Sequence, residues 1–204
     1  MKYPDNIREL SNLDINMAGF IFYEKSSRFV GNDFKKENID VLPARIKRVG
    51  VFVNSDWAYV EKKQEQYALD YLQLHGNERP DYCEKLKRKD TGIIKAFSVD
   101  DSFDFLKLEA FQASCDFFLF DTKGPLKGGN GAAFNWDVLQ NYRLNTPFLL
   151  SGGIGAENIS EALKLRHPQL AGFDMNSKLE IKPALKSVQL SKQTIEKIRN
   201  YECC

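Results

Sequence analysis

Short apolar segments alternate with helical segments along the whole chain, and this alternation constrains the fold most strongly. Each apolar segment is nearly continuous in hydrophobicity and is bounded by Gly, Pro, Asn or Asp. Continuous hydrophobicity is typical of parallel strands that are covered on both faces. The predicted strands cover residues 18–23, 48–54, 71–76, 92–99, 116–121, 147–153 and 171–177.

Helical segments separate these strands, and one of them precedes the first strand. Asp56, Asp101 and Ser191 are predicted N-caps, because each can accept a hydrogen bond from a free backbone N–H group. The predicted helices cover residues 4–13, 33–41, 56–65, 79–87, 101–110, 136–141, 156–165 and 191–201.

Strict alternation of seven strands and eight helices predicts an α/β fold, a (β/α)8 TIM barrel of the phosphate-binding type. A chain of 204 residues suits one barrel domain, which we expect to span residues 1–204. Because the first element is a helix, strand 1 of such a barrel is missing from this chain. A doubly wound sheet of seven strands is the alternative.

Composition excludes some partners. The hydrophobic content of 43% and the net charge of +1 describe a globular protein with no excess charge to attract nucleic acid or an anionic membrane. No apolar run approaches the ~20 residues of a membrane span, and the N-terminus is no signal peptide, so we expect a cytoplasmic protein. The cysteines form no C-x-x-C pair and lie at no metal-ligand spacing from a histidine, which predicts reduced thiols. They are Cys83, Cys115, Cys203 and Cys204.

Polar residues follow the predicted strands where a barrel collects its function, at the strands' carboxyl ends. Asp121 closes a Phe-rich strand, so it is a candidate general acid; a solvated loop carboxylate is the alternative. Arg28 is a candidate clamp for a substrate carboxylate, or else a solvated surface arginine. His75 is a candidate substrate-binding residue or else a structural histidine. Asp174 is a candidate substrate-binding residue or else a residue that orients nearby backbone groups.

Two turns have the composition of a phosphate site. Gly152 and Gly153 expose backbone N–H groups at the end of one predicted strand, and Asn176 and Ser177 lie at the end of the next strand. Flexible connecting turns are the alternative. The segment 124–131, which includes Gly128 and Gly129, is predicted to be a mobile loop that closes over a ligand, with a passive linker as the alternative.

At these residues the chain resembles the phosphoribosylanthranilate isomerase family of tryptophan biosynthesis, over nearly its whole length. The resemblance implies a (β/α)8 barrel without cofactor or metal, acting on a phosphorylated small molecule as a monomer or homodimer. The implied reaction is an Amadori rearrangement of N-(5-phosphoribosyl)anthranilate to 1-(2-carboxyphenylamino)-1-deoxyribulose 5-phosphate. The segments that carry the resemblance are GFIFYEKSSRFV, RVGVFVN, YLQLHGNE, IIKAF, FLFDTKGPLKGGNGAAFNW, PFLLSGGI and FDMNSKLE.

The resemblance also implies roles for single residues. Arg28 would bind the anthranilate carboxylate, and Asp121 would protonate the furanose ring oxygen. His75 and Asp174 would contact the substrate. The four residues of the two turns would bind its phosphate.

This chain departs from the family pattern at its N-terminus. The family begins with a strand that ends in Cys-Gly, and that cysteine is the general base; both precede the position of Met1. Lys178 stands where the family usually has glycine, and residues 132–134 read Ala-Ala-Phe in place of Lys-Thr-Phe. We therefore expect impaired isomerase activity. The alternative is a catalytically inactive barrel that retains phosphate-ligand binding or an interaction role. A related isomerase of histidine biosynthesis fits the segments QLHG and EKSSR poorly.

Overall fold

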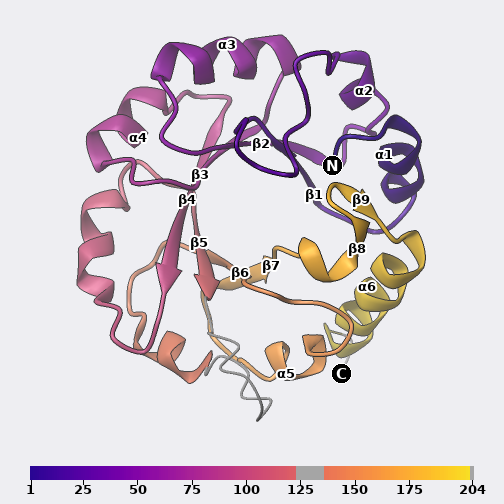
Figure 1. The fold of residues 1–204 in the computed structure, drawn as a ribbon. Coiled ribbons are helices and arrows are strands. Elements are labelled where there is room, and N and C mark those ends of the chain that lie inside the picture. Colours follow the sequence, from indigo (N-terminus) through magenta and orange to yellow (C-terminus); the bar gives the residue numbers. More distant parts are fainter. Residues whose placement is uncertain (123–135, 203–204) are drawn as a thin grey trace.

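The computed structural model describes residues 1–122 and 136–202, and its central element is a parallel sheet of seven strands (Figure 1). The strands lie side by side in the order in which they occur along the chain. They are β1 (Met17–Ile21), β2 (Lys47–Phe52), β3 (Tyr71–Leu74), β4 (Gly92–Val99), β5 (Phe117–Thr122), β6 (Phe148–Ser151) and β7 (Leu170–Phe173).

Helices surround the sheet as an outer ring (Figure 1). The α-helices are α1 (Pro4–Ser11), α2 (Glu37–Asp40), α3 (Trp57–Tyr67), α4 (Pro80–Leu86), α5 (Ile159–Ala162) and α6 (Val188–Glu202). Three 3₁₀ helices are η1 (Phe105–Phe111), η2 (Trp136–Asn141) and η3 (Ser177–Leu179). A small antiparallel hairpin of β8 (Glu180–Lys182) and β9 (Leu185–Lys186) lies between β7 and α6. No helix in the described part of the chain is long and apolar enough to cross a membrane.

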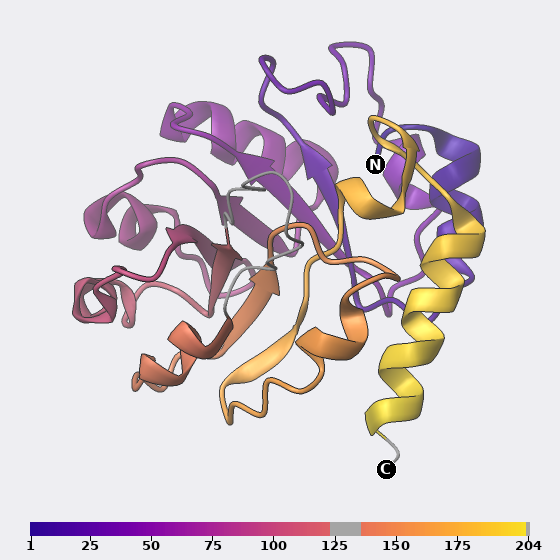
Figure 2. The same ribbon diagram turned by 60° about the horizontal axis from the view of Figure 1, so that its bottom comes forward.

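The sequential strand order decides between the two predicted folds. A doubly wound sheet reverses its strand order at a switch point, whereas here each strand pairs only with its neighbours in sequence. The prediction of a curled parallel α/β sheet with seven strands is therefore confirmed. Within residues 1–122 and 136–202, β1 and β7 are the two edges of this sheet and do not pair with each other. The helical ring is closed at that place, because α1 packs against α6 (Figure 2).

The core has two layers, one on each face of the sheet, and β5 contributes side chains to both. Phe118 and Phe120 point to the large cluster between the sheet and the helices, while Leu119 points to a small cluster inside the curl. The inner cluster also contains Val49 and Ile94. Alternate residues of a strand face opposite sides of the sheet. The Phe-rich strand therefore buries the rings of Phe118 and Phe120 between the sheet and the helices, and only smaller apolar side chains such as Leu119 are fully buried inside the curl.

Of the three predicted N-caps, one is confirmed and two were wrong. Asp56 is the N-cap of α3, as predicted, because its carboxylate accepts a hydrogen bond from Ala58 N at 2.8 Å. Asp101 caps nothing; Asp104 accepts from Leu106 N at 3.1 Å and starts η1, which is a 3₁₀ helix. Ser191 lies inside α6, since that helix begins at Val188. The β8–β9 hairpin was not predicted, because strands of two or three residues carry no readable periodicity.

Candidate functional site

A cavity of about 820 Å³ lies inside the curl of the sheet and extends from the carboxyl ends of the strands, at His75 and Asp121, to their amino ends, at Met17 and Leu170. All eight predicted site residues within the described part of the chain line this cavity. They are Arg28, His75, Asp121, Gly152, Gly153, Asp174, Asn176 and Ser177. Gly128 and Gly129 lie outside the described residues, as do Cys203 and Cys204.

Asp121 and His75 form a pair across the mouth of the sheet. Asp121 lies near the end of β5 and His75 directly after β3, with 3.4 Å between Asp121 Oδ2 and His75 Nε2. On the other side of the ring, Gln73 Nε2 lies 3.1 Å from His75 Nδ1. Because the Gln73 amide is a donor there, Nδ1 is the acceptor and Nε2 carries the proton toward Asp121. Sequence reasoning missed Gln73, although a polar residue inside the apolar strand YLQL was a usable signal.

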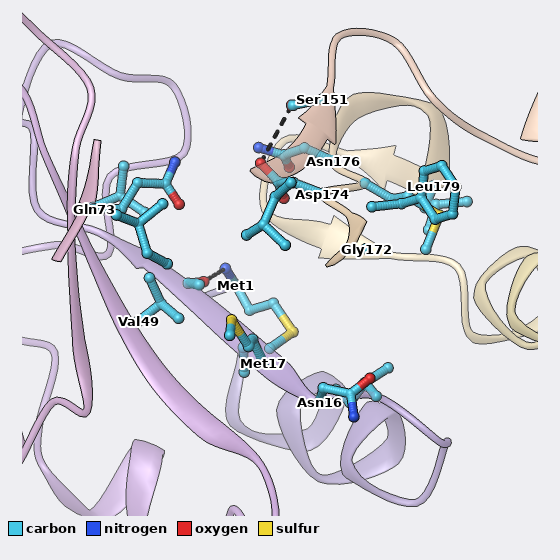
Figure 3. Close-up of a pocket in the computed structure, with 18 of the residues that line it drawn as sticks. Met1, Asn16, Met17, Val49, Gln73, Ser151, Gly172, Asp174, Asn176 and Leu179 are labelled. Atoms are coloured by element: carbon cyan, nitrogen blue, oxygen red, sulfur yellow. Dashed lines mark hydrogen bonds between the residues drawn. The ribbon is translucent and has the colours of Figure 1, made fainter. Parts of the chain in front are cut away.

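Asp174 is a second carboxyl group at the same mouth. It follows β7, and Ser151 Oγ lies 3.3 Å from its Oδ2 (Figure 3). Burial raises the pKa of Asp174, while His75, Lys186 and the Ser151 hydroxyl partly offset that rise. The side chain therefore holds a proton more readily than an exposed aspartate.

Arg28 is held by a carboxylate that the sequence did not reveal. Its Nη2 lies 2.6 Å from Glu180 Oε2, and its Nε donates to both oxygens of Glu180 at 2.9 Å. Burial acts to raise the pKa of Glu180, but hydrogen bonds from Arg28 and the charge of Lys186 lower it to about 2. Arg28 is thus not a solvated surface residue. The Nε and Nη2 edge of its guanidinium is already paired with Glu180 and is not available to a substrate carboxylate.

Lys186, from β9, joins Glu180 to the predicted phosphate turn. Its Nζ lies 3.2 Å from Glu180 Oε1 and donates to the Asn176 carbonyl oxygen at 2.8 Å, with a further bond to Asn176 Oδ1. Asn6 holds Lys186 from α1 through two backbone hydrogen bonds, of 2.9 and 2.8 Å. The hairpin therefore positions both Arg28 and the Asn176 turn.

The two glycine-containing turns meet at one side of the cavity. Gly152 and Gly153 have φ angles of 107° and 69°, which L-residues with side chains rarely adopt. A Cβ atom on Gly155 would lie 2.5 Å from Lys178 Cβ, so the turn after β6 abuts the turn after β7. Lys178, the departure from the family pattern, directs its amine to Glu157 at 3.6 Å.

The gap between β1 and β7 contains the N-terminus of this chain. The Met1 amine donates a hydrogen bond to the Gly19 carbonyl oxygen at 2.7 Å, and Met1 lies beside Met17 and Val49 in the cavity (Figure 3). Burial lowers the pKa of this amine to about 5. A backbone nitrogen that donates to β1 occupies the place of a neighbouring strand.

Thiols and metal ligands do not converge on the cavity within the described residues. Cys83 and Cys115 are free and buried, as predicted for reduced thiols, and neither lines the cavity. No three His, Cys, Asp or Glu side chains of residues 1–122 and 136–202 are grouped as metal ligands would be.

A curled parallel sheet whose carboxyl ends bring polar side chains into one cavity is typical of enzymes of the α/β barrel class. The family model for N-(5'-phosphoribosyl)anthranilate isomerase matches residues 2–197, and the chain belongs to this family.

Known members support this assignment. The curated N-(5'-phosphoribosyl)anthranilate isomerase of Parabacteroides distasonis is 45% identical over 199 residues, which cover 97% of this chain and 90% of the relative. The crystal structure of the Thermotoga maritima isomerase has a TM-score of 0.84 at 27% identity and covers 98% of this chain and 96% of that one. A second crystal structure, at 24% identity and a TM-score of 0.82, is of a phosphoribosyl anthranilate isomerase in complex with reduced 1-(o-carboxyphenylamino)-1-deoxyribulose 5-phosphate; the match covers 98% of this chain and 95% of that one. At that identity, the likeness shows the fold alone.

Proposed function

We propose that the cavity converts N-(5-phosphoribosyl)anthranilate to 1-(2-carboxyphenylamino)-1-deoxyribulose 5-phosphate, a step of tryptophan biosynthesis. One observation carries this proposal: the residues assigned to acid, carboxylate and phosphate roles line a single cavity. The substrate is a small phosphorylated molecule, and the chain acts as a monomer or homodimer.

Asp121 is the proposed general acid. It gives its proton to the furanose ring oxygen, so that the bond between this oxygen and C1 breaks and the aryl nitrogen stabilises the resulting cation at C1. A group that donates a proton in the transition state contributes about 10²–10⁴-fold to the rate. His75 orients the carboxyl group from behind, at 3.4 Å.

Arg28 is the proposed partner of the anthranilate carboxylate. Glu180 binds Nε and Nη2, and Nη1 makes no hydrogen bond within the described residues. A charge-assisted hydrogen bond from Arg28 Nη1 is directional and stronger than a neutral one, so it selects a carboxylated ring.

Asp174, at the same mouth, is the proposed contact for the sugar hydroxyl groups.

The second half of the reaction needs a base that removes the proton from C2 of the ring-opened sugar. We infer that the active enzyme has an eighth parallel strand between β1 and β7, which ends in Cys-Gly and supplies a cysteine as this base. β1 and β7 end the seven-stranded sheet without pairing with each other. Within the described residues, the outer edge of β1 meets the Met1 nitrogen at Gly19 and an isolated bridge between Ile21 and Phe29, and these observations support the inference.

Binding of the reduced product analogue to this chain tests the proposed site without needing the base. We expect micromolar or tighter binding by calorimetry, and at least a tenfold loss for Gly155→Ala. The added Cβ would lie 2.5 Å from Lys178 Cβ and would push the two phosphate turns apart. A tenfold loss corresponds to about 1.4 kcal/mol.

The control for this variant removes the atom that the new methyl group meets. Gly155→Ala combined with Lys178→Gly leaves room for the methyl group, so binding should return to within about threefold of the original chain. Unchanged binding in the single variant, or no recovery in the double variant, would place the phosphate elsewhere.

A further inference from the structure

A buried ion pair lies next to the turn that carries His75, outside the main cavity. The side chains of Lys95 in β4 and Glu78 near the start of α4 are 2% and 3% exposed, and Lys95 Nζ lies 3.3 Å from Glu78 Oε2. Neither residue lines the main cavity. Burying two charges costs free energy unless hydrogen bonds satisfy them, so the contacts of this pair indicate what it holds in place.

Glu78 binds two backbone N–H groups of two different turns. Its Oε1 accepts from Asn54 N at 2.8 Å, and its Oε2 accepts from Gly76 N at 2.9 Å. Asn54 follows β2 and Gly76 follows β3, so one carboxylate joins the ends of two adjacent strands.

Lys95 binds three backbone carbonyl oxygens around the same turn. Its Nζ donates to Leu74 at 3.2 Å, Gly76 at 2.9 Å and Ala96 at 2.8 Å. Together the two side chains therefore bind both the N–H and the C=O of Gly76. Residues on either side of His75 are thus fixed by one buried ion pair.

Further contacts hold the same turn against the end of β2. Asn54 Oδ1 accepts from Asn77 N at 2.6 Å, and a Cβ atom on Gly76 would lie 2.4 Å from that same oxygen. The His75 N–H donates to the Phe52 carbonyl oxygen at 2.8 Å. The backbone that carries the imidazole is therefore held from below by Lys95 and from the side by β2 and its turn.

We propose that Glu78 and Lys95 are positioning residues that fix the His75 ring between Gln73 and Asp121. The fixed backbone places Nδ1 at 3.1 Å from the Gln73 amide, so that Nε2 carries the proton and faces Asp121 Oδ2 at 3.4 Å. One carboxyl oxygen of Asp121 is then engaged and the other is available to the ligand. This role deepens the proposed isomerase function and rests on it for its chemical meaning.

Nitrogen-15 NMR of the two histidines tests this proposal in the protein as it exists. At about pH 8, where an unperturbed imidazole is neutral, His75 should show the pattern of a single tautomer with the proton on Nε2. In Glu78→Gln, the new amide keeps one acceptor and leaves Lys95 without its counter-charge. We expect the His75 signals to move to the averaged pattern of both tautomers.

His167 is the internal control for folding. Its Nδ1 accepts from Gln169 N at 3.1 Å and its Nε2 lies 3.2 Å from the Tyr142 carbonyl oxygen, which also places the proton on Nε2. Its signals should be unchanged in every folded variant. Glu180→Gln is the matched control, because it removes another buried carboxylate at the far side of the cavity and should leave His75 unchanged.

A second variant covers the case in which Glu78→Gln fails to fold. Glu78→Gln with Lys95→Met leaves no unpaired buried charge and keeps the volume of the lysine stem, and it should show the same averaged His75 pattern. A single Nε2–H tautomer of His75 in either folded variant would overturn the proposal. Since this readout needs no substrate, loss of analogue binding in the original chain would reject the isomerase site while leaving this result intact.

Discussion

Extending the chain ahead of Met1 by about six residues, apolar and ending in Cys-Gly, should raise the free energy of unfolding by about 3–5 kcal/mol. The added strand is expected to pair with the outer edges of β1 and β7 and to bury three or four apolar side chains, each worth about 1.5–3 kcal/mol before the entropy of ordering is subtracted. Urea denaturation measures the change, and the slope of the transition should increase because more surface becomes exposed on unfolding.

The same extension should alter how stability depends on pH. The Met1 amine has a pKa of about 5 when folded, against 8.0 as the ordinary value. Between these values the unfolded chain binds more protons, so the stability of the original chain rises from pH 5 to pH 8, by at most about 4 kcal/mol. A peptide amide cannot be protonated there, so the extended chain should lose this part of the dependence.

A polar extension of equal length, made of Gly and Ser, separates the two effects. It also converts the Met1 amine to an amide, so it should flatten the pH dependence, but it offers no apolar side chains to the gap. If the apolar extension gave no more stability than this control, the gap would not be the place of a strand.

Asp121→Asn in the extended chain should lower the turnover number by about 10²–10⁴-fold, the usual contribution of a general acid. Asparagine has the same shape and still accepts from His75 Nε2, so the affinity for the reduced product analogue should change less than threefold. Steady-state kinetics and calorimetry on the same preparation measure the two quantities. An equal loss in both would make Asp121 a binding residue.

The exposed Asp101, which follows β4 and does not line the cavity, provides a matched control. Asp101→Asn removes the same charge from the same face and should keep both quantities unchanged. A turnover number of Asp121→Asn within tenfold of the parent would reject its role as the acid.

The cavity residues could be predicted because of a topological rule. Parallel strands bring their carboxyl ends to one edge, so the last residues of segments 71–76, 116–121 and 147–153 had to meet if those segments were strands. The Phe-rich segment at 116–121 could be predicted as a strand because its rings had to be buried between the sheet and the helices. Strand 92–99 has the predicted bounds, and the ends of the other strands are displaced by at most four residues from the predicted ones, which did not alter the meeting point.

The supporting residues could not be predicted, because their partners are distant in sequence. Glu180 pairs with Arg28 across 152 positions, and Lys186 meets Asn6 across 180. No motif in the sequence marks Glu78 and Lys95 as partners, and only the fold shows that both are buried. The N-cap at Asp104 was misplaced to Asp101 because the segment offers three aspartates within five residues and local propensity does not choose among them.

The measurement that tests the central claim most directly is the loss of phosphoribosylanthranilate fluorescence with two extended chains, one ending its added strand in Cys-Gly and the other in Ser-Gly. If the cavity is an isomerase site that lacks only its base, the Cys-Gly chain should turn over at least about 10²-fold faster than both the Ser-Gly chain and the original chain. No turnover by a folded Cys-Gly chain would contradict the account and would favour an inactive barrel that only binds a phosphorylated ligand.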